Sequence, residues 1–462
     1  MTIQERIKER RIGIVGMARS GLGAAHLAKR FGGIPFVSDT APAEKLAAQM
    51  AGLREAGIPF EVGGHTDLLL NSDYLVVSPG VTLKAEIITR ALHKGLPVFS
   101  ELEFASWVCR GAIVAITGTN GKTTTTTLAG ELFRAGGFST FVCGNIGLAF
   151  TEVADQVPPN GVAVVEVSSF QLETVADFRP HVAAILNITP DHLDRHGSMV
   201  EYRKTKFRIA ENQSADDYFI LNGEDPESVA SRPETKATRM TFSTRENDNA
   251  ATFVRDGRLW FRFGGREGAI CTTSEIAIPG PHNLQNAAAA LACTLPFEIP
   301  PRVIAGVLAS FAGVEHRLER AGTVAGVTFI NDSKATNVDS VCVALRSMTQ
   351  PTYLILGGRD KGGSYMPIVE AGKKVIRGLI VIGEAREKIF NALGRTFPVV
   401  FAESLEEAVA KGFDQAHPGE TVLLSPACAS FDMFENFEHR GRVFKAAVAS
   451  LKNGKKKGET VS

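Results

Sequence analysis

The chain has 462 residues, of which 44% are hydrophobic and 22% are charged. This composition excludes a disordered, collagen-like or small disulfide-stabilised protein, and the length predicts about two to four domains. Lys and Arg together number 50, as do Asp and Glu, so the net charge of +0 gives no global attraction to nucleic acid or to an anionic membrane.

The six cysteines are scattered, and no two lie at C-x-x-C spacing or in a Cys/His cluster. This pattern is typical of proteins from a reducing compartment and disfavours both structural zinc and disulfides. No apolar run approaches the ~18 residues needed to span a membrane, and the charged N-terminus is unlike a secretory signal. We therefore expect a soluble, cytoplasmic protein with no membrane span and no nucleic-acid partner. A monomer is expected as well, although no sequence feature specifies the oligomeric state.

The first predicted strand is RIGIVGM, residues 11–17, which ends at a glycine-rich turn. Residues 20–32 then show helical apolar spacing, and residues 35–39 and 73–80 predict two more strands. Strands that alternate with helices indicate βαβ units and a parallel sheet.

The same alternation starts twice more, at residues 112–118 (AIVAITG) and 326–332 (GVTFIND). Further buried strands are predicted in segments 161–169, 181–188, 353–358, 378–383 and 421–427. Residues 251–263 alternate around an Asp-Gly pair, which predicts a hairpin and an antiparallel annex to the second sheet. The polar tail, residues 452–462, is expected to be frayed.

The most specific motif is ITGTNGKTTT, residues 116–125. Its glycines allow backbone N–H groups to converge on phosphate oxygens, and the following helix adds the positive end of its dipole. Lys122 is placed to reach the β- and γ-phosphates, and the Thr123 hydroxyl to bind Mg²⁺. The match to G-x-x-x-x-G-K-[ST] is partial, because residue 116 is Ile. The alternative, a plain turn with a solvated Lys, is disfavoured by the strand–loop–helix context.

Two further polar groups follow buried strands. Glu166 ends the apolar run VAVVE, at the edge where open α/β sheets bind ligands. His192 lies in TPDHLDRH, after the strand at 181–188. A carboxylate and an imidazole there could serve Mg²⁺, although an ordinary loop histidine explains His192 equally well from spacing alone.

An alternative function is suggested by the first glycine-rich turn. Gly16, Gly21 and Gly23 follow a strand, and Asp39 lies about 20 residues further on, as in a dinucleotide-binding fingerprint. This would indicate an NAD-dependent oxidoreductase. The signal is weak because the tight G-x-G pair is missing, and it leaves the phosphate loop unexplained.

Taken together, the motifs resemble the Mur ligase superfamily of ATP-dependent amide-bond ligases. The resemblance covers residues 10–445 and is carried by GTNGKT, Glu166, NITPDHLDRH (187–196), HNLQNAAAA (282–290), NDSKATN (331–337), LGGRDKGG (356–363) and LSPACASFDMFENFEHRG (424–441). The last three segments are similar to those of the members that add D-glutamate to UDP-N-acetylmuramoyl-L-alanine in peptidoglycan precursor synthesis. A related ligase for another amino acid, or a non-catalytic nucleotide-binding relative, is the alternative.

The resemblance implies an α/β fold of three domains. These are a Rossmann-like, UDP-substrate-binding domain (residues 1–105), a central P-loop ATPase-type domain with a mainly parallel sheet (106–312), and a Rossmann-like, amino-acid-binding domain (313–462). ATP and Mg²⁺ are the implied cofactors, and the UDP-sugar and D-glutamate are the implied substrates.

Site residues follow from the resemblance at matching positions. The implied nucleotide-binding residues are Gly118, Thr119, Asn120, Gly121, Lys122, Thr123, Thr124, Asn283, Asn286, Arg317, Asp332 and Lys334. The implied magnesium ligands are Thr123, Glu166, His192 and a carbamylated Lys206, and the implied catalytic residues are Lys122, Glu166, His192 and Lys206. Arg203, Lys204 and Arg208 are expected to favour the modification by lowering the pKa of Lys206.

The substrate pockets are implied in the same way. Residues for the UDP-sugar are Ser20, Asp39, Thr40, Ser78, Gly80, Asn145 and His192, and residues for D-glutamate are Thr336, Lys361, Ser430, Phe431, Asn436 and Phe437. Two positions depart from the family pattern. Ala18 stands where relatives commonly have Gly, and Ala41 where some have Arg, so one or two UDP-sugar contacts are expected to differ.

Overall fold

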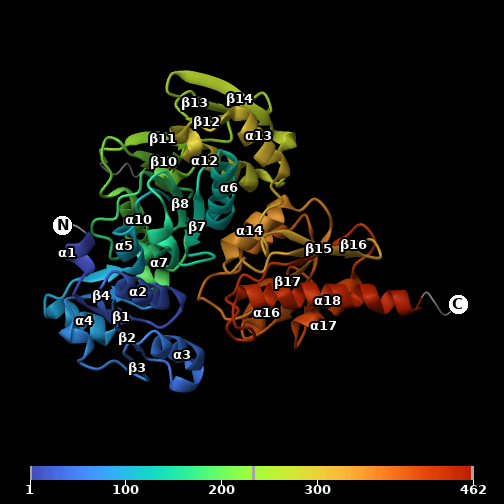
Figure 1. The fold of residues 1–462 in the computed structure, drawn as a ribbon. Helices are drawn as coiled ribbons and strands as arrows, with labels where there is room; N and C mark the ends of the chain where they lie inside the picture. Colours follow the sequence, from blue (N-terminus) through green and yellow to red (C-terminus); the bar gives the residue numbers. More distant parts are fainter. Residues whose placement is uncertain (1–2, 231–234, 459–462) are drawn as a thin grey trace. The chain divides into compact units, whose positions relative to one another are not determined.

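The protein is described here from a computed structural model, in which residues 3–230 and 235–458 are described. The chain divides into two compact units. The first comprises residues 1–278 and 283–311 and holds two sheets; the second comprises residues 279–282 and 312–462 and holds one. Figure 1 shows all three sheets with their helices. The domain bounds expected at residues 105 and 312 stay predictions.

The N-terminal sheet is entirely parallel, with strand order β3-β2-β1-β4-β5. Its strands are β1 (Arg11–Val15), β2 (Ile34–Asp39), β3 (Phe60–Val62), β4 (Tyr74–Val77) and β5 (Val98–Ser100). Its helices are α1 (Ile3–Ile7), α2 (Arg19–Arg30), α3 (Ala47–Glu55), α4 (Glu86–His93) and α5 (Glu101–Ser106), with 3₁₀ turns η1 (Ala43–Lys45) and η2 (Leu69–Asn71). After β1, the strands β2 and β3 are added on one side of it, and β4 and β5 on the other. Parallel sheets bind ligands at such a switch point in strand order.

The central sheet has nine strands in the order β14-β13-β12-β11-β10-β9-β6-β8-β7. They are β6 (Ala112–Thr117), β7 (Thr140–Gly144), β8 (Val162–Glu166), β9 (Val182–Ile185), β10 (Tyr218–Asn222), β11 (Thr238–Phe242), β12 (Thr252–Arg255), β13 (Arg258–Phe263) and β14 (Arg266–Thr272). Strands β6 to β12 pair in parallel. Strand β13 pairs antiparallel with both β12 and β14, which confirms the predicted hairpin annex.

The helices of this part include the buried Ala-rich helix that the sequence predicts at residues 287–293. They are α6 (Lys122–Ala135), α7 (Phe150–Val153), α8 (Ser169–Leu172), α9 (Leu193–His196), α10 (Met199–Phe207), α11 (Pro226–Ala230), α12 (Pro281–Thr294) and α13 (Pro301–Ser310). Short 3₁₀ turns are η3 (Ala154–Gln156), η4 (Arg208–Ala210), η5 (Thr273–Glu275) and η6 (Leu295–Phe297).

One hydrophobic core joins the two sheets of the first unit. It includes Phe104 after the N-terminal sheet and Phe150 and Phe178 from the central part, all fully buried. Burial of large aromatic side chains is a main source of folding free energy. The shared core therefore explains why the two sheets form a single compact unit, and it fixes the residues between them.

The second unit is built on a six-stranded sheet of order β15-β16-β20-β17-β18-β19. Its strands are β15 (Glu319–Val324), β16 (Val327–Asn331), β17 (Thr352–Gly357), β18 (Ile376–Ile382), β19 (Val399–Phe401) and β20 (Thr421–Leu424). Its helices are α14 (Val338–Ser347), α15 (Pro367–Gly372), α16 (Arg386–Leu393), α17 (Leu405–Gln415) and α18 (Phe437–Gly458). Hydrophobic cores cover both faces of the sheet.

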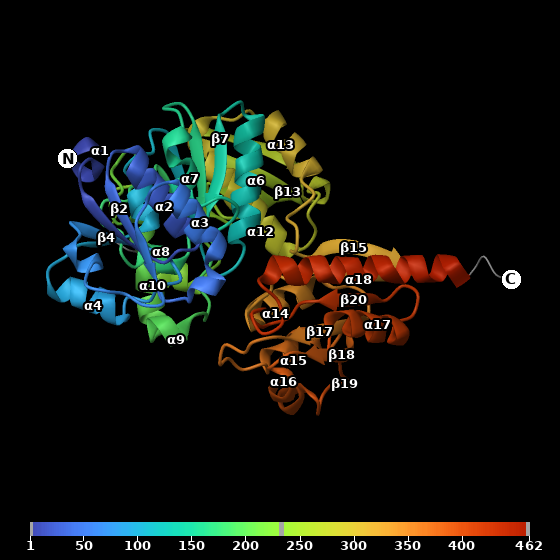
Figure 2. The same ribbon diagram turned by 60° about the horizontal axis from the view of Figure 1, so that its bottom comes forward.

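Two features of this unit differ from the sequence predictions. Strand β15 pairs antiparallel with β16, so the sheet is mixed rather than purely Rossmann-like. The expected frayed tail is wrong as far as residue 458, because α18 continues to Gly458; residues 459–462 lie outside the described part. Figure 2 shows α18 lying along β15 and α17, and this packing supports the helix. In the described part of the chain, no helix is long and apolar enough to cross a membrane.

Candidate active site

The phosphate loop joins the buried strand β6 to helix α6, as the sequence predicts. Gly118 and Gly121 have φ angles of 154° and 84°, which residues with a Cβ rarely adopt. Gly121 is the N-cap of α6 and provides no side-chain cap. No side chain of the N-cap residue therefore caps the first amide groups of α6, and uncapped amides at a helix N-terminus favour an anion.

Neighbouring segments hold this loop in place. The Asn187 side chain accepts a hydrogen bond from the Asn120 amide at 2.8 Å and donates one to the Asn120 carbonyl at 3.1 Å. The Thr119 hydroxyl donates to the Thr189 carbonyl at 3.0 Å. Asn187 was not predicted as a site residue, although its place as a polar residue shortly after a buried strand could have indicated this role.

Two lysines meet at the carbonyl oxygen of Gly118. The Nζ of Lys122 donates to it at 2.9 Å and the Nζ of Lys206 at 3.0 Å. The Lys206 side chain is only 1% exposed. Burial, followed by the charge of Lys122, lowers the pKa of Lys206 well below its usual value.

The direction of this pKa shift agrees with the prediction, but the expected cause was wrong. Arg203, Lys204 and Arg208 lie on or just beyond α10, whereas the charge that lowers the pKa of Lys206 is that of Lys122. Arg203 forms an ion pair with Glu227, and Lys204 is exposed. Like-charge repulsion therefore arises from a contact across the fold rather than from sequence neighbours.

Glu166 ends β8 beside the phosphate loop, as predicted. One carboxylate oxygen accepts a hydrogen bond from the Thr123 hydroxyl at 2.7 Å, and the other accepts from the Asn145 amide at 2.9 Å. The residue is 1% exposed. A buried carboxylate next to a hydroxyl is a pair of hard oxygen donors, so Thr123 and Glu166 fit Mg²⁺.

His192 lies in the turn before α9 with a φ of 53°. Its ring packs edge-on against Phe170, with 4.7 Å between ring centroids, and its Nε2 lies 3.6 Å from a carboxylate oxygen of Asp191. Asp191 also acts on Lys206, where its charge raises the pKa. His192 and Asp191 are thus near the lysine end of the site, and Asp191 was missed in the sequence.

Asn286 on α12 contacts the phosphate loop. Its side-chain oxygen accepts from the Thr125 hydroxyl at 3.2 Å, and its amide donates to Asn283 at 3.1 Å. A Cβ on Gly121 would lie 2.4 Å from this oxygen. The two asparagines of the HNLQNAAAA segment are therefore next to the loop, where the resemblance implies a nucleotide.

This close approach predicts that Gly121→Ala weakens ATP binding. Ala at Gly137, whose φ of 88° is similar but which has open space around it, is the matched control. Both variants should lower the free energy of unfolding by about 1–2 kcal/mol, because each forces a left-handed conformation. Only Gly121→Ala should also raise the Kd for ATP in a calorimetric titration. Equal ATP affinity of the two variants would contradict the placement of Asn286.

A cavity of about 150 Å³ lies where the two sheets of the first unit meet. Its lining residues are Ala18, Arg19, Ser20, Pro79, Glu101, Gly144, Asn145, Ala149 and Gln171. The structure thus brings Ser20 and Asn145 together, as the resemblance implies for the UDP-sugar. Asn145 also links the cavity to the phosphate loop through its bond to Glu166.

The other residues expected at the UDP-sugar in the N-terminal part are not among those that line this cavity. The Asp39 carboxylate accepts hydrogen bonds from the amides of Met17 (2.7 Å) and Ala41 (2.8 Å), so it orders the first glycine-rich turn. Ser78 is buried beside Gly16, whereas Thr40 and Gly80 are exposed. The roles of these residues toward a substrate stay predictions.

In the second unit, Asp332 and Arg317 lie close to one another. Asp332 is buried and accepts from the Ser425 hydroxyl at 2.8 Å. Burial raises the pKa of Asp332 to about 6, and the charge of Arg317 opposes this shift. The Lys334 ammonium lies 5.0 Å from the centre of the Phe437 ring.

Three loops at the carboxyl ends of β16, β20 and β17 are tied together. The amide of Ala427 donates to the carbonyl of Ala335 at 2.9 Å, and Arg359 and Ala429 exchange two backbone hydrogen bonds. These loops carry four of the six residues implied for D-glutamate: Thr336, Lys361, Ser430 and Phe431. Lys361 and Phe431 are exposed, and Ser430 is buried.

Arg440 on α18 fixes two of these loops, and sequence reasoning missed it. Its fully buried guanidinium donates to the Ser333 hydroxyl and carbonyl and to the Cys428 carbonyl, at 3.0, 2.8 and 3.2 Å. Nearby, Asn436 accepts from the His439 amide at 2.7 Å and so caps the start of α18. Asn436 therefore has a structural role, whatever its role toward a substrate.

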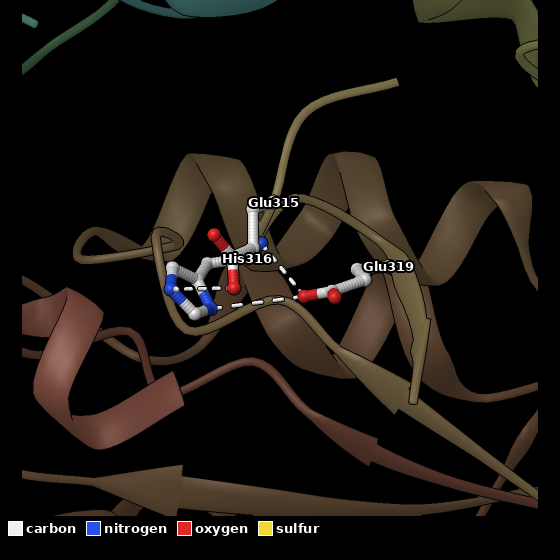
Figure 3. Close-up of side chains that lie close together, drawn as sticks. All are labelled: Glu315, His316 and Glu319. Atoms are coloured by element: carbon white, nitrogen blue, oxygen red, sulfur yellow. Dashed lines mark hydrogen bonds and ion pairs between the residues drawn. The ribbon is translucent and has the colours of Figure 1, made fainter. Parts of the chain in front are cut away.

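Figure 3 shows a second cluster of titratable groups, Glu315, His316 and Glu319. The ring nitrogens of the buried His316 lie 3.7 Å from each carboxylate. The ammonium of Lys445 already bonds both carboxylates, one at 2.9 Å. A protein cation therefore balances this cluster, which we interpret as an ion-pair network.

Comparison with known proteins identifies the family. The Mur ligase MurD-like N-terminal domain matches residues 10–100, the Mur ligase middle domain residues 116–294, and the Mur ligase glutamate ligase domain residues 316–428. The chain belongs to the Mur ligase family. This assignment leaves the oxidoreductase alternative without support.

Among Mur ligases, similar relatives are UDP-N-acetylmuramoylalanine–D-glutamate ligases. That of Salinibacter ruber is 43% identical, covering 97% of this chain and 99% of the relative. That of Geotalea uraniireducens is 44% identical, covering 96% of this chain and 98% of the relative. A solved Mur ligase with a similar fold is the UDP-N-acetylmuramate-alanine ligase of Thermotoga maritima, with a TM-score of 0.60, 20% identity, and coverage of 96% of this chain and 100% of that one.

Proposed function

We propose that this chain is an ATP-dependent ligase that joins D-glutamate to UDP-N-acetylmuramoyl-L-alanine, as a cytoplasmic step of peptidoglycan precursor synthesis. The observation that carries the proposal is full-length similarity, at 43% and 44% identity, to relatives of that name. The geometry supports it, because phosphate loop, buried carboxylate and lysines lie together in the first unit.

The reaction needs an activated carboxylate, because hydroxide is a poor leaving group. An oxygen of the acceptor carboxylate attacks the γ-phosphorus of ATP, and ADP leaves. Lys122 and the first amides of α6 hold the phosphates and balance the charge that develops on them. Mg²⁺, held by Thr123 and Glu166 with His192 nearby, would shield the negative charges of phosphate and carboxylate from one another.

The second step is attack by an amine. The amine of D-glutamate attacks the carbonyl carbon of the acyl phosphate, phosphate leaves, and the nitrogen loses a proton. The two carboxylates of D-glutamate need a cation and hydroxyl donors, which Lys361, Thr336 and Ser430 provide on the three connected loops. Arg317, Asp332 and Lys334 serve the nucleotide, as the resemblance implies.

Carbamylation of Lys206 is part of the proposal. A neutral amine adds CO₂ and releases a proton, which yields an anionic carbamate suited to Mg²⁺. Two observations support this chemistry. Lys206 is buried, and its lowered pKa favours the neutral amine that reacts.

Phosphate release from ATP, measured with a panel of amino acids and UDP-muramoyl acceptors, tests the function. We expect release to require UDP-N-acetylmuramoyl-L-alanine and D-glutamate together. Release with a different amino acid in place of glutamate would favour another Mur ligase activity. Release that needs neither substrate would contradict a ligase altogether.

A further inference from the structure

The cavity at the junction of the two sheets has features of an anion site. Helix α2 begins at its wall with Arg19 and Ser20, and the N-cap residue Ala18 provides no side-chain hydrogen bond. The first amide groups of a 12-residue helix are thus left for another partner. The cavity is also lined by Asn145, directly after β7, and by Gln171 on α8, whose side-chain amides donate to Glu166 at 2.9 Å and to Glu101 at 2.6 Å.

The same cavity is also lined by an acid, Glu101, which the sequence analysis did not single out. Glu101 is only 2% exposed. One carboxyl oxygen accepts from the Gln171 amide at 2.6 Å, and the other has no hydrogen-bond partner among the described residues. An unpaired oxygen on a buried carboxyl group is costly unless the group is neutral or finds a ligand.

The surroundings of Glu101 favour the neutral acid. Burial raises its pKa to about 7, while the Gln171 hydrogen bond and the charge of Arg19 act in the other direction. The thiol of Cys143 on β7 interacts with Glu101, and burial raises the pKa of that thiol too. On the other elements packed against α5, Tyr74, Glu152 and Asp155 hydrogen-bond to groups other than Glu101.

We propose that Glu101, in its protonated form, donates a hydrogen bond to an anionic oxygen of the acceptor substrate. This inference rests on the proposed function, since the acceptor carries a diphosphate and a carboxylate. A protonated carboxyl group is a donor, whereas an ionised one only accepts and would repel an anion in the same cavity. Glu101 therefore positions the acceptor and makes its affinity depend on pH.

Calorimetric titration of the whole protein with UDP-N-acetylmuramoyl-L-alanine tests this role. With a pKa of about 7, the protonated fraction of Glu101 falls about tenfold between pH 6 and pH 8. We expect acceptor binding to weaken by about tenfold over this range. At pH 8, titrations in buffers of different ionisation enthalpy should show uptake of about one proton.

Two variants separate Glu101 from other titrating groups. Glu101→Gln keeps a donor but does not titrate, so it should bind the acceptor equally at both pH values and take up no proton. Glu44→Gln, at an exposed carboxyl group of the same unit, should behave as the wild type.

The outcomes distinguish this inference from the proposed function. Wild-type binding with no pH dependence and no proton uptake would overturn the role of Glu101 alone, and this result requires no variant to fold. Retention of the pH dependence by Glu101→Gln would overturn it too. Failure of the wild type to bind the acceptor at either pH would overturn the proposed function and this inference together.

Discussion

Replacement of Lys122 by Ala is expected to reduce the rate of phosphate release by ~10²–10³, the usual loss when a preorganised charge is removed from a transferring group. In the structure, the Lys122 ammonium donates to main-chain carbonyls of its own loop, at 2.9 Å to Gly118 and 2.8 Å to Thr119. The ammonium is thus kept beside the loop that is proposed to bind the phosphates.

Initial rates at saturating acceptor and D-glutamate measure this effect. The control is Lys94→Ala, at an exposed lysine of the same unit, which should retain wild-type rates. Thermal unfolding of both variants should be close to that of the wild type. If Lys122→Ala stayed within a few-fold of the wild-type rate, Lys122 would be an ordinary loop residue and the assigned phosphate site would be wrong.

Replacement of Lys206 by Ala is expected to reduce activity by about 10- to 100-fold, the range typical for loss of a group that supports a bound metal. Added acetate or formate should restore part of the activity, because a small carboxylate can occupy the place of the carbamate. Lys204→Ala is the matched control, since Lys204 lies on the same helix but is exposed.

A spectroscopic measurement separates carbamylation from a purely structural role. Wild-type protein equilibrated with isotope-labelled CO₂ should show a carbamate carbon signal by NMR, and Lys206→Ala should lack it. Absence of the carbamate signal from the wild type, together with full activity of Lys206→Ala, would show that neither the carbamate nor the lysine is needed for the reaction.

Much of the first unit could be predicted because its signals are local. The strands around the phosphate loop are short apolar runs that parallel sheets bury on both faces, and the Asp-Gly pair specifies the hairpin between β12 and β13. The position of Glu166 followed from the same rule, since it ends such a run. The positions of Lys122 and Thr123 could be predicted from the motif alone, because a glycine-rich loop precedes a helix there.

The remaining features depend on contacts between distant residues. Strand β15 has the sequence ERAGTV, which contains Gly and charges and acquires strand structure by pairing with β16. Glu101 follows a short strand, and its sequence context is that of an ordinary acidic residue at the start of a helix. Its hydrogen-bond partner Gln171 lies 70 residues further along the chain. Arg440 is similar, because its partner Ser333 lies 107 residues earlier in the chain.

The structure of the polar C-terminal segment could not be predicted for a different reason. Its lysines and glycines give no apolar periodicity, so the sequence predicts a frayed tail at residues 452–462. In the structure, α18 begins at Phe437 and continues to Gly458, and the buried residues Phe444 and Val448 anchor its earlier turns. Helix propagation from an anchored segment requires little local hydrophobicity, which explains the difference.

The handedness of the amino acid used tests the central claim most directly. The three connected loops are expected to hold both carboxylates of glutamate, so the amine is aimed at the acyl phosphate for only one enantiomer. Product formation should be measured by mass spectrometry with UDP-N-acetylmuramoyl-L-alanine, ATP and either D- or L-glutamate. We predict efficient formation of the amide with D-glutamate and little with L-glutamate; equal rates with the two enantiomers would contradict the assignment.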